Sequence, residues 1–261
     1  MKLTVIITHH HTPQLLANCL RSLVRSLNNV EHEIIVTDNQ CNGFDCLQSQ
    51  WPKVKFLCFN QDQGYTRLVN SGLKKACGDY FLILNADTII ADGQIELMLE
   101  YYQKQSKIGL LGPRLVNPKG QWQPSCFREQ TWLNIVARRT RLGKTKFGQR
   151  LISRLCYQDR NLRKIQTAEW LMGSVLLISR EFLNKIGYLD ERFKMYFSDA
   201  DWARRARQAG LAVVYFPLAE LTHCHQRSSH KGHGIFDLLF SPLARTHLLD
   251  AIKYFWKWKN Q

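Results

Sequence analysis

The chain has 261 residues, of which 45% are hydrophobic, enough for one large α/β domain with its own core and too few for two ordinary domains. Its 36 Lys and Arg against 21 Asp and Glu give a net charge of +15, which predicts attraction to polyanions such as nucleic acid, anionic lipid or phosphorylated substrates. No apolar run approaches the roughly 20 residues of a spanning helix, so we expect any membrane contact to be peripheral.

Short β-branched runs alternate with segments of helical period in the first half of the chain. We predict strands at 3–8, 33–37, 55–59 and 80–84, and helices at 13–27, 64–75 and 93–103. This alternation is typical of parallel βαβ units. Near-continuous apolar strands between amphipathic helices predict a Rossmann-like, mostly parallel sheet covered on both faces, with its ligand beyond the carboxyl ends of the strands.

The second half of the chain is less regular. Residues 138–164 are basic, which predicts a helical insertion or a mobile lid. Beyond them we predict a strand at 174–178, helices at 180–186 and 202–208, and a further strand at 212–216. No internal repeat or low-complexity tract interrupts the chain, which favours a single domain followed by a short C-terminal segment.

Polar and acidic side chains follow the predicted strands at the expected ligand edge. Asn85 and Asp87 are two residues apart at the end of a buried strand, so their side chains point the same way. Mg²⁺ or Mn²⁺ held by such oxygens would neutralise charge on a nucleoside-diphosphate leaving group. The alternative is that Asp87 only caps the turn before the next helix.

Several short motifs follow one another in an order that one enzyme family shares. They are Val5-Ile-Ile-Thr8, Val36-Thr-Asp-Asn39, Asp62-Gln-Gly-Tyr65 followed by Asn70, Gly78 to Asp87, Gly112 to Pro118, Gln123-Pro-Ser125, Trp170-Leu-Met-Gly173, and Gly187 to Phe197 running into Asp199-Ala-Asp201. With its motifs in this order, the chain resembles the inverting glycosyltransferase family 2 over nearly its whole length. It is most similar to the rhamnosyltransferase-like members, which act in the synthesis of bacterial O-antigen and other surface polysaccharides. The resemblance implies a GT-A domain over 1–240, with a nucleotide-binding half at 1–110 and an acceptor and catalytic half at 111–240.

The resemblance also implies which residues meet the nucleotide. Asp38 is expected to bind the edge of the nucleobase, as the acidic residue after the second strand does in the family. Thr8 and Asn70 are expected near the nucleotide. His9 stands where a Tyr that packs against the base is common, so we expect it to contact the base by stacking.

The metal site follows from the same resemblance. Asn85 and Asp87 match the family's D-x-D-type motif, in which the last Asp meets the cation and the preceding Asn contributes to the nucleotide site. His223 matches a histidine that can complete the metal site, and we favour it over His225. Zinc binding by these histidines with those at 9–11 lacks regular ligand spacing.

The catalytic base is expected just before the last predicted helix. The family's motif reads approximately F-E-D-x-D, and the Asp after its Glu, here Asp199, takes the proton of the acceptor hydroxyl. Ser198 replaces that Glu. Displacement from the face opposite the diphosphate would invert the anomeric centre through an oxocarbenium-like state. We expect Asp201 to bind the acceptor or to start the helix, and N-terminal capping is the alternative for both carboxylates.

Two further segments are expected to contact substrates. Trp170 and Gly173 match a W-x-x-G segment near the acceptor, with a plain core position as the alternative for Trp170. Residues 227–229 lie in a segment rich in Gly and His and are candidates to close over the phosphates.

The C-terminal segment 241–261 mixes apolar, aromatic and cationic residues at helical spacing. Such a helix is typical of an anionic membrane surface. The alternative is that Leu248, Leu249, Ile252 and Phe255 pack onto the domain, and both arrangements can hold together. Eight scattered cysteines without a C-x-x-C pair, and a start without signal-peptide features, predict a cytoplasmic protein at the inner face of the membrane.

The leading hypothesis is therefore transfer of one sugar, best rhamnose from dTDP-rhamnose, from a dTDP- or UDP-sugar donor to a lipid-linked or polysaccharide acceptor. A basic nucleic-acid-binding protein is the alternative that the charge allows. The chain carries no zinc-finger, basic-zipper or RNA-recognition signature, and its acidic ligand edge would repel phosphodiesters. We expect no nucleic-acid partner.

Overall fold

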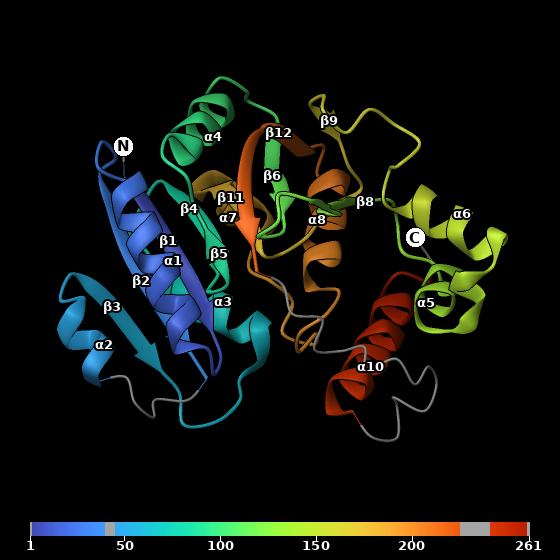
Figure 1. Ribbon diagram of the computed structural model, residues 1–261, viewed down its shortest axis with the longest axis horizontal. Helices are drawn as coiled ribbons and strands as arrows, with labels where there is room; N and C mark the ends of the chain where they lie inside the picture. The colour runs from blue at the N-terminus through green and yellow to red at the C-terminus, as the bar shows by residue number, and fades with distance from the viewer. Residues whose placement is uncertain (1, 40–44, 225–240, 260–261) are drawn as a thin grey trace.

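A central sheet organises the fold, with strand order β3-β2-β1-β4-β11-β6-β12-β5 (Figure 1). The structure is a computed structural model that describes residues 2–39, 45–224 and 241–259. In the first half the elements are β1 (Leu3–His9), α1 (Pro13–Ser26), β2 (His32–Asp38), α2 (Asp45–Gln50), β3 (Val54–Cys58), α3 (Gly64–Lys75), β4 (Tyr80–Asn85), β5 (Thr88–Ile89), α4 (Gln94–Gln103) and β6 (Ile108–Val116). The sequence predicted this alternation, except α2, β5 and β6.

The second half adds shorter strands and a helical insertion. Its elements are β7 (Trp122–Gln123), β8 (Cys126–Phe127), α5 (Trp132–Arg139), the 3₁₀ helix η1 (Arg141–Lys144), α6 (Lys146–Leu155), β9 (Gln166–Thr167), β10 (Trp170–Leu171), β11 (Val175–Ser179), α7 (Arg180–Ile186), α8 (Ser198–Gln208), β12 (Ala212–His223) and α10 (Pro242–Lys257). The basic segment after residue 138 is helical at its start, as predicted.

Parallel pairing in the first half of the sheet confirms the βαβ prediction. β1 pairs in parallel with both β2 and β4, and β2 pairs in parallel with β3. β11 runs antiparallel to β4, so the sheet is mostly parallel rather than wholly so. The parallel strands end together, which brings the residues that follow them to one edge.

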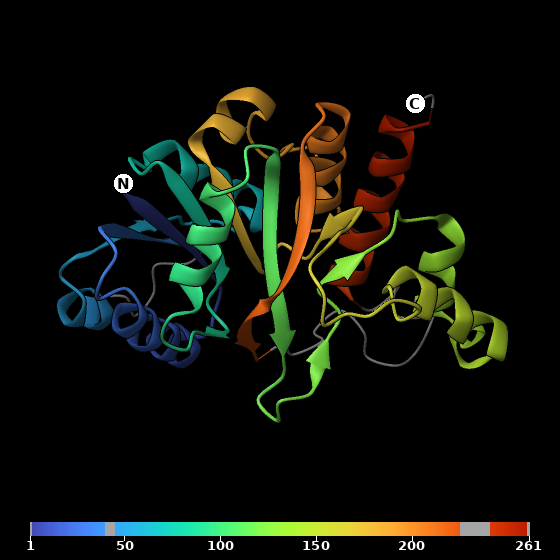
Figure 2. The ribbon, with the colours of Figure 1, turned by 90° about the horizontal axis from the view of Figure 1, so that it is seen from above.

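Helices cover both faces of this sheet because side chains alternate along each strand. On β1, Val5 and Ile7 join the core cluster that holds residues of α1 and α4, whereas Ile6 joins the cluster that holds residues of α3, α7 and α8. Figure 2 shows α1 and α4 on one side of the strands and α7 and α8 on the other. The two-sided burial that the apolar strands predicted is confirmed.

Two elements in the second half differ from the predicted bounds. α8 begins at Ser198, one turn before the predicted start at Trp202, so Asp199 lies in its first turn. β12 continues past the predicted end at residue 216, through an irregularity between Phe216 and Glu220, to His223. His223 therefore lies on a sheet strand, opposite Thr88.

α10 packs onto the domain, which the sequence left open as the alternative to a membrane surface, but mostly through side chains other than the four considered there. Its buried side chains include Ala251 and Tyr254, with Trp258 just after its end. Leu249 and Ile252, expected in the core, are 56% and 49% exposed, and Leu248 is exposed as well. Small and aromatic side chains fill this interface, so the aliphatic positions point outward. Of the four residues expected to pack, only Phe255 lies against the core cluster.

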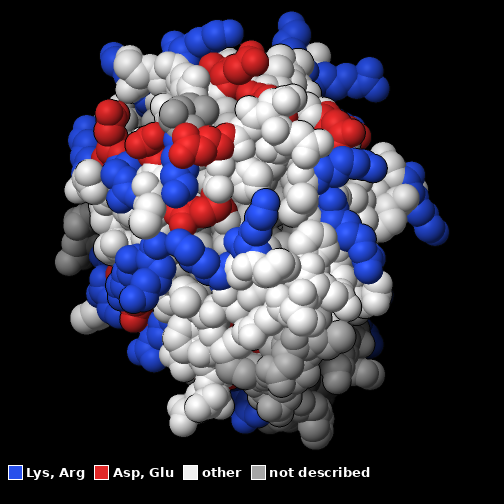
Figure 3. Space-filling model, turned by 90° about the vertical axis from the view of Figure 1, so that its left-hand side faces the viewer, with Lys and Arg blue, Asp and Glu red and all other residues white. Residues whose placement is uncertain are grey.

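Charge is unevenly distributed over the described surface. On the face shown in Figure 3, Lys and Arg are interspersed with Asp and Glu. Between residues 132 and 155, by contrast, the sequence holds seven Lys and Arg and no acidic residue. The helices α5, η1 and α6 thus carry seven of the fifteen net positive charges of the chain.

Candidate active site at the strand ends

Strand register brings four of the predicted nucleotide residues together. Thr8 lies opposite Asn85 across β1 and β4, and His9 lies opposite Asp38 across β1 and β2. The Thr8 hydroxyl donates to Asn85 Oδ1 at 3.1 Å, and His9 Nδ1 lies 3.0 Å from Asp38 Oδ1. β1 lies between β2 and β4. Its last two residues, Thr8 and His9, therefore link the end of β2, where Asp38 lies, to the end of β4, which Asp87 follows.

Asp38 presents one buried carboxylate oxygen for which the described residues provide no hydrogen bond. His9 Nε2 accepts the Thr12 N–H at 3.0 Å, so the proton of the ring is on Nδ1 and is donated to Asp38 Oδ1. Asp38 Oδ2 is buried and has no hydrogen-bond partner among the described residues. A buried acceptor of this kind calls for a donor from a ligand.

His9 is itself buried, with 3% of its surface exposed. Its two ring nitrogens contact Asp38 and the Thr12 amide, which fixes the ring in the protein. These contacts favour a role in orienting the Asp38 carboxylate. Stacking of His9 on the base, which the sequence suggested, stays a prediction.

Asp87 and His223, the predicted metal ligands, are 136 residues apart in the sequence and meet in space. Asp87 follows β4, and His223 ends β12, which pairs with β5 directly after Asp87. His223 Nε2 lies 3.3 Å from Asp87 Oδ1, and the Cys224 N–H donates to the Asp87 carbonyl at 2.8 Å. The short strand β5 therefore positions both groups.

Gln123 fixes the histidine ring from the other side. Its Oε1 lies 3.0 Å from His223 Nδ1, and its Nε2 donates to the His223 carbonyl at 3.0 Å. The Nδ1 proton is thereby assigned to the bond with Gln123, which turns the Nε2 lone pair toward Asp87. In a metal-binding histidine, the ring nitrogen that does not face the metal is usually hydrogen-bonded to a carboxylate or carbonyl oxygen.

The Asp87 carboxylate oxygen is the kind of ligand that Mg²⁺ and Mn²⁺ prefer, and the facing imidazole nitrogen is a ligand of the kind that transition-metal ions accept. Among the described residues, no group of three or more His, Cys, Asp and Glu side chains forms a complete metal site. Such cations are often bound by one or two protein groups together with substrate phosphate oxygens. The pair of Asp87 and His223 fits that arrangement. His225 and residues 227–229, also considered from the sequence, lie outside the described residues.

Asp199 lies at the start of α8, partly buried and bound by backbone amides. The Gly173 N–H donates to Asp199 Oδ2 at 3.0 Å, and the Ala200 N–H donates to Oδ1 at 2.9 Å. Burial raises the pKa of Asp199 to about 6, although these N–H groups act to lower it. A carboxylate with this pKa is largely ionised at neutral pH and still able to accept a proton.

Gly173 joins the candidate base to the strand edge, and only glycine fits there. A Cβ on Gly173 would lie 2.6 Å from the Tyr65 hydroxyl oxygen and 3.4 Å from Asp199 Oδ2. Tyr65, at the start of α3, donates its hydroxyl to the Gly173 carbonyl at 2.5 Å. The next residue, Ser174, accepts the Asn85 N–H at 2.9 Å. One turn of chain therefore holds Asp199 on one side and the end of β4 on the other.

The segment that leads into Asp199 is held by Asp250 of α10, a residue the sequence did not identify. The buried Asp250 carboxylate accepts the backbone N–H groups of Lys194, Met195 and Tyr196 at 3.2, 3.0 and 3.0 Å. Phe197 then adopts a left-handed backbone with φ of 67°, which is strained for a bulky residue. The only hint in the sequence is that Asp250 is the one acidic residue between 242 and 261.

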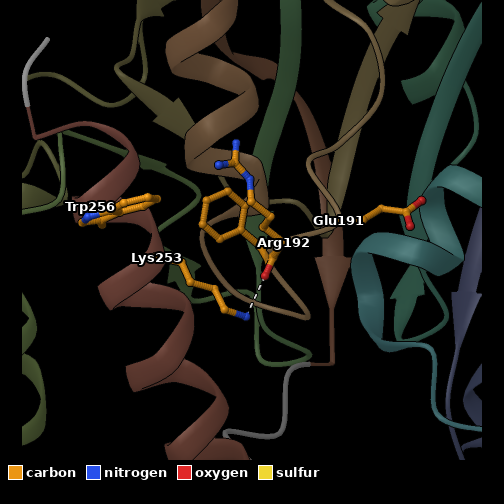
Figure 4. Close-up of a pocket in the computed structure, with 5 residues that line it drawn as sticks. Glu191, Arg192, Lys253 and Trp256 are labelled. Atoms are coloured by element: carbon orange, nitrogen blue, oxygen red, sulfur yellow. Dashed lines mark hydrogen bonds between the residues drawn. The ribbon is translucent and has the colours of Figure 1, made fainter.

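Further contacts tie α10 to the same loop. Lys253 donates from Nζ to the Arg192 carbonyl at 2.8 Å (Figure 4). Lys253 and Trp256 project from α10 and, with Glu191, Arg192 and Phe193, line an open hollow beside the loop. The Glu191 side chain points away from α10 (Figure 4). α10 is therefore part of the support of the candidate base.

Asp201 anchors the end of α10. Its carboxylate has no exposed surface, and its oxygens contact Arg205 at 2.9 Å, Lys257 at 2.5 Å and Trp258 Nε1 at 3.1 Å. With both oxygens engaged inside the protein, these contacts favour a structural role over the acceptor binding that the sequence suggested.

Asn70, whose place near the nucleotide stays a prediction, hydrogen-bonds to the chain before the loop that leads into Asp199. Its side-chain N–H groups donate to the Leu189 carbonyl at 2.9 Å and to Glu191 Oε1 at 3.1 Å. Its Oδ1 accepts the Leu189 N–H at 3.1 Å. These contacts within the protein favour a positioning role for Asn70 on α3.

Trp170, a predicted acceptor residue, is buried in the core. Its ring stacks on Phe127 with centroids 4.2 Å apart, and its Nε1–H donates to the Arg128 carbonyl at 2.8 Å. The core position, which the sequence left as the alternative, is favoured by these contacts. Of the W-x-x-G pair it is Gly173 that reaches the candidate site.

Comparison with known sequences identifies related proteins. The family model described as glycosyl transferase family 2 matches residues 4–204. An N-acetylglucosaminyl-diphospho-decaprenol L-rhamnosyltransferase of Mycobacterium tuberculosis is 30% identical over 197 residues, which cover 71% of this chain and 61% of that protein. The dTDP-rhamnosyl transferase RfbF of Shigella flexneri is 22% identical over 246 residues, covering 92% of this chain and 75% of RfbF.

Solved structures share the architecture. GalNAc-T7, solved with UDP, GalNAc and Mn²⁺, superimposes with a TM-score of 0.65 at 17% identity, over 90% of this chain and 45% of that chain. TarS of S. aureus superimposes with a TM-score of 0.54 at 17% identity, over 83% of this chain and 37% of TarS. At this identity the likeness shows the fold alone, and it is the GT-A fold that the sequence predicted.

Proposed function

Because the chain belongs to glycosyl transferase family 2, we propose that it transfers one sugar from a nucleoside-diphosphate donor to an acceptor hydroxyl, inverting the anomeric carbon. One observation carries the proposal. The turn at Gly173 and Ser174 links Asp199 to the end of β4, two residues before Asp87. A carboxylate suited to hold the cation of a leaving diphosphate and a carboxylate suited to accept a proton thus belong to one connected site.

The donor is proposed to be a uracil or thymine nucleotide. Asp38 Oδ2 is buried without a hydrogen-bond partner among the described residues, and the N3–H of either base would donate to it. Thr8 and Asn85 lie beside it at the same edge and complete the proposed nucleotide site. Our best candidate is dTDP-rhamnose, which the names of the mycobacterial and Shigella relatives support.

A divalent cation, Mg²⁺ or Mn²⁺, would be held by Asp87 and His223 with oxygens of the diphosphate. When bound, it would neutralise the charge that develops on the leaving group. Asp87 comes from the half of the domain at 1–110, which we assign to the donor, and His223 from the half at 111–240, which we assign to the acceptor and the base. The facing carboxylate and imidazole, and the Gln123 contact to His223, support this assignment of the cation site.

Asp199 is proposed as the general base. As the acceptor oxygen forms its bond to C1 of the sugar, its proton moves to the Asp199 carboxylate and the bond from C1 to the diphosphate oxygen breaks. The Gly173 and Ala200 amides hold the carboxylate in one orientation, so a single face of the sugar is approached. Attack from the side opposite the diphosphate inverts the configuration.

We further propose a lipid-linked or polysaccharide acceptor in surface-glycan synthesis, at the cytoplasmic side of the membrane. The printed name of the mycobacterial relative, which states transfer to N-acetylglucosaminyl-diphospho-decaprenol, supports a lipid-linked acceptor. Within the part of the chain that the structure describes, we find no helix with the length and apolar character needed to cross a bilayer.

The experiment that tests the proposal is incubation with a panel of nucleotide sugars, with Mn²⁺, with Mg²⁺ and with a chelator. We expect slow hydrolysis of one dTDP- or UDP-sugar, stimulated by the cation, and release of a sugar whose first-formed anomer, followed by NMR, is inverted. Asp199→Asn, assayed in parallel, should lose the transfer reaction. Consumption of no donor, or release of the retained anomer, would contradict the proposal.

A further inference from the structure

Exposed apolar side chains are concentrated on three helices at one end of the molecule. Of the fourteen large hydrophobic side chains that are exposed among the described residues, eight lie on α5, α6 and α10. We call them the apolar face: Trp132, Leu133, Val136, Phe147, Leu248, Leu249, Ile252 and Trp256. Exposed apolar side chains that gather on one part of a protein often mark a contact with a partner or a membrane.

The apolar face spans two segments far apart in the sequence, the α5 and α6 hairpin and α10, which are joined by aromatic stacking. Trp132 of α5 stacks on Phe255 of α10 with ring centroids 4.4 Å apart. Figures 1 and 2 both place α10 beside the hairpin of α5 and α6. Because α10 packs inward through Ala251 and Tyr254, Leu249 and Trp256 lie on the side of the helix turned away from the core.

The helices that carry the apolar face also carry many exposed cations. The seven Lys and Arg between residues 132 and 155 have no acidic residue among them, and Arg245 and Lys253 are exposed on α10. The single acid of α10, Asp250, is buried against the loop before Asp199 and adds no negative charge to this face. An anionic, partly apolar partner is therefore complementary to the surface.

We propose that the apolar face docks onto the headgroup region of an anionic phospholipid bilayer. A helix with leucine, isoleucine and tryptophan on one side and cations alongside lies in the plane of the membrane, with its apolar side chains at the acyl boundary. Lys and Arg near it bind the anionic headgroups. The hairpin of α5 and α6 adds a second insertion point beside α10, which fixes the orientation of the protein on the bilayer.

This inference deepens the proposed function, because it rests on an acceptor held at a membrane. α10 binds the loop before Asp199 through Asp250 and is anchored to α8 through the contact of Asp201 with Lys257. A bilayer bound to the outer side of α10 would lie one helix away from the candidate base. The head of a lipid-linked acceptor would then be presented to the site without leaving the membrane.

The test is flotation with phosphatidylcholine vesicles that do or do not contain phosphatidylglycerol. The full chain should float with the anionic vesicles, less so at high salt, and remain behind with phosphatidylcholine alone. The double variant Leu249→Glu with Trp256→Glu should lower binding by about tenfold or more, since two inserted apolar side chains become charged. Both side chains are exposed, at 56% and 76%, so the core is unchanged.

Leu218→Glu is the matched control. Leu218 is 58% exposed but lies on β12, away from the apolar face, and its substitution should leave vesicle binding unchanged. Cation-stimulated donor hydrolysis without vesicles should be equal in all three proteins. If the unaltered protein shows no such hydrolysis, this result counts against the proposed function and does not affect the docking result.

Two results would overturn the docking proposal. One is vesicle binding by the double variant equal to that of the unaltered protein. The other is a stable dimer in sedimentation equilibrium that the double variant abolishes, because the apolar face would then be the contact between two copies of the chain.

Discussion

The two halves of the candidate site are positioned by different kinds of contact. Asp38 and Asp87 follow parallel strands, so the backbone register of the sheet sets their places. Asp199 follows a loop that is held by side chains from elsewhere, chiefly Asp250, which lies 54 to 56 residues away from the amides it accepts. We expect a sheet edge to tolerate the loss of one side chain, whereas a loop held chiefly by one carboxylate should be sensitive to its removal.

Among the variants that test how each half of the site is held, removal of the Asp250 carboxylate should have the largest effect on stability and turnover. In Asp250→Ala, three backbone N–H groups lose a charged acceptor, which we expect to lower the free energy of unfolding by about 3 kcal/mol. Turnover should fall by about tenfold or more, because the loop before Asp199 loosens. Nucleotide affinity, measured by calorimetry, should change by less than about twofold.

Asp250→Asn and Lys253→Met serve as controls for this prediction. The amide keeps one acceptor oxygen and should restore part of the turnover. Lys253 lies 3.6 Å from Asp250 and its side chain is 48% exposed, so its removal should change stability by less than about 1 kcal/mol. An equal fall in nucleotide affinity and turnover in Asp250→Ala would show that the two halves are not separately supported.

Gln123→Ala probes the support of the metal pair. Without Gln123 the His223 ring loses the contact that fixes its Nε2 toward Asp87, and we expect apparent Mn²⁺ affinity to fall by about tenfold. The measurement is donor binding titrated with Mn²⁺, with a chelator as the zero point. An unchanged titration would mean that His223 does not contribute to cation binding.

Asp38→Asn should weaken binding of uridine or thymidine diphosphate by about tenfold, equivalent to about 1.4 kcal/mol. An amide can accept from His9 only by turning its NH₂ toward the base, where it would oppose the N3–H. Cytosine carries an acceptor at N3, so cytidine diphosphate should lose less affinity or gain some. Equal losses for all three nucleotides would contradict the contact of Asp38 with the base.

The smallest expected effect is on pH dependence. Since the pKa of Asp199 is raised to about 6, its base form is lost as pH falls, and turnover at pH 6 should be about half that at neutral pH. The raised pKa also means that this carboxyl contributes stability below its ordinary pKa of 3.8 that is lost as pH rises through about 6. A flat profile of turnover between pH 5 and 7 would argue against Asp199 as the base.

The sequence located the strand ends of the candidate site because strand and helix patterns are local. The apolar strands and helical periods predicted β1, β2 and β4, and the roles of the residues that follow them stay predictions. The partner of Asp87 is 136 residues away, and only the family resemblance pointed to His223. Gln123 and Tyr65, which fix His223 and Gly173, act through tertiary contacts that no local pattern encodes.

The contacts that hold the loop before Asp199 were harder to predict, because they join residues that are far apart in the sequence. The aliphatic residues of α10 suggested a face that proved to be exposed, because the core on this side is filled by Ala251, Tyr254 and Trp258. Asp250 reads in the sequence as a surface acid on a basic helix. Its burial follows from the loop that it binds, which periodicity cannot show.

The most direct test measures donor binding and transfer side by side in Asp87→Asn and Asp199→Asn. We predict a crossed result: Asp87→Asn loses most of its cation-dependent donor affinity, while Asp199→Asn binds the donor normally and transfers sugar at least about a hundredfold more slowly. Normal turnover in Asp199→Asn, or joint loss of binding and turnover in both variants, would contradict the separation of donor and base on which this assignment depends.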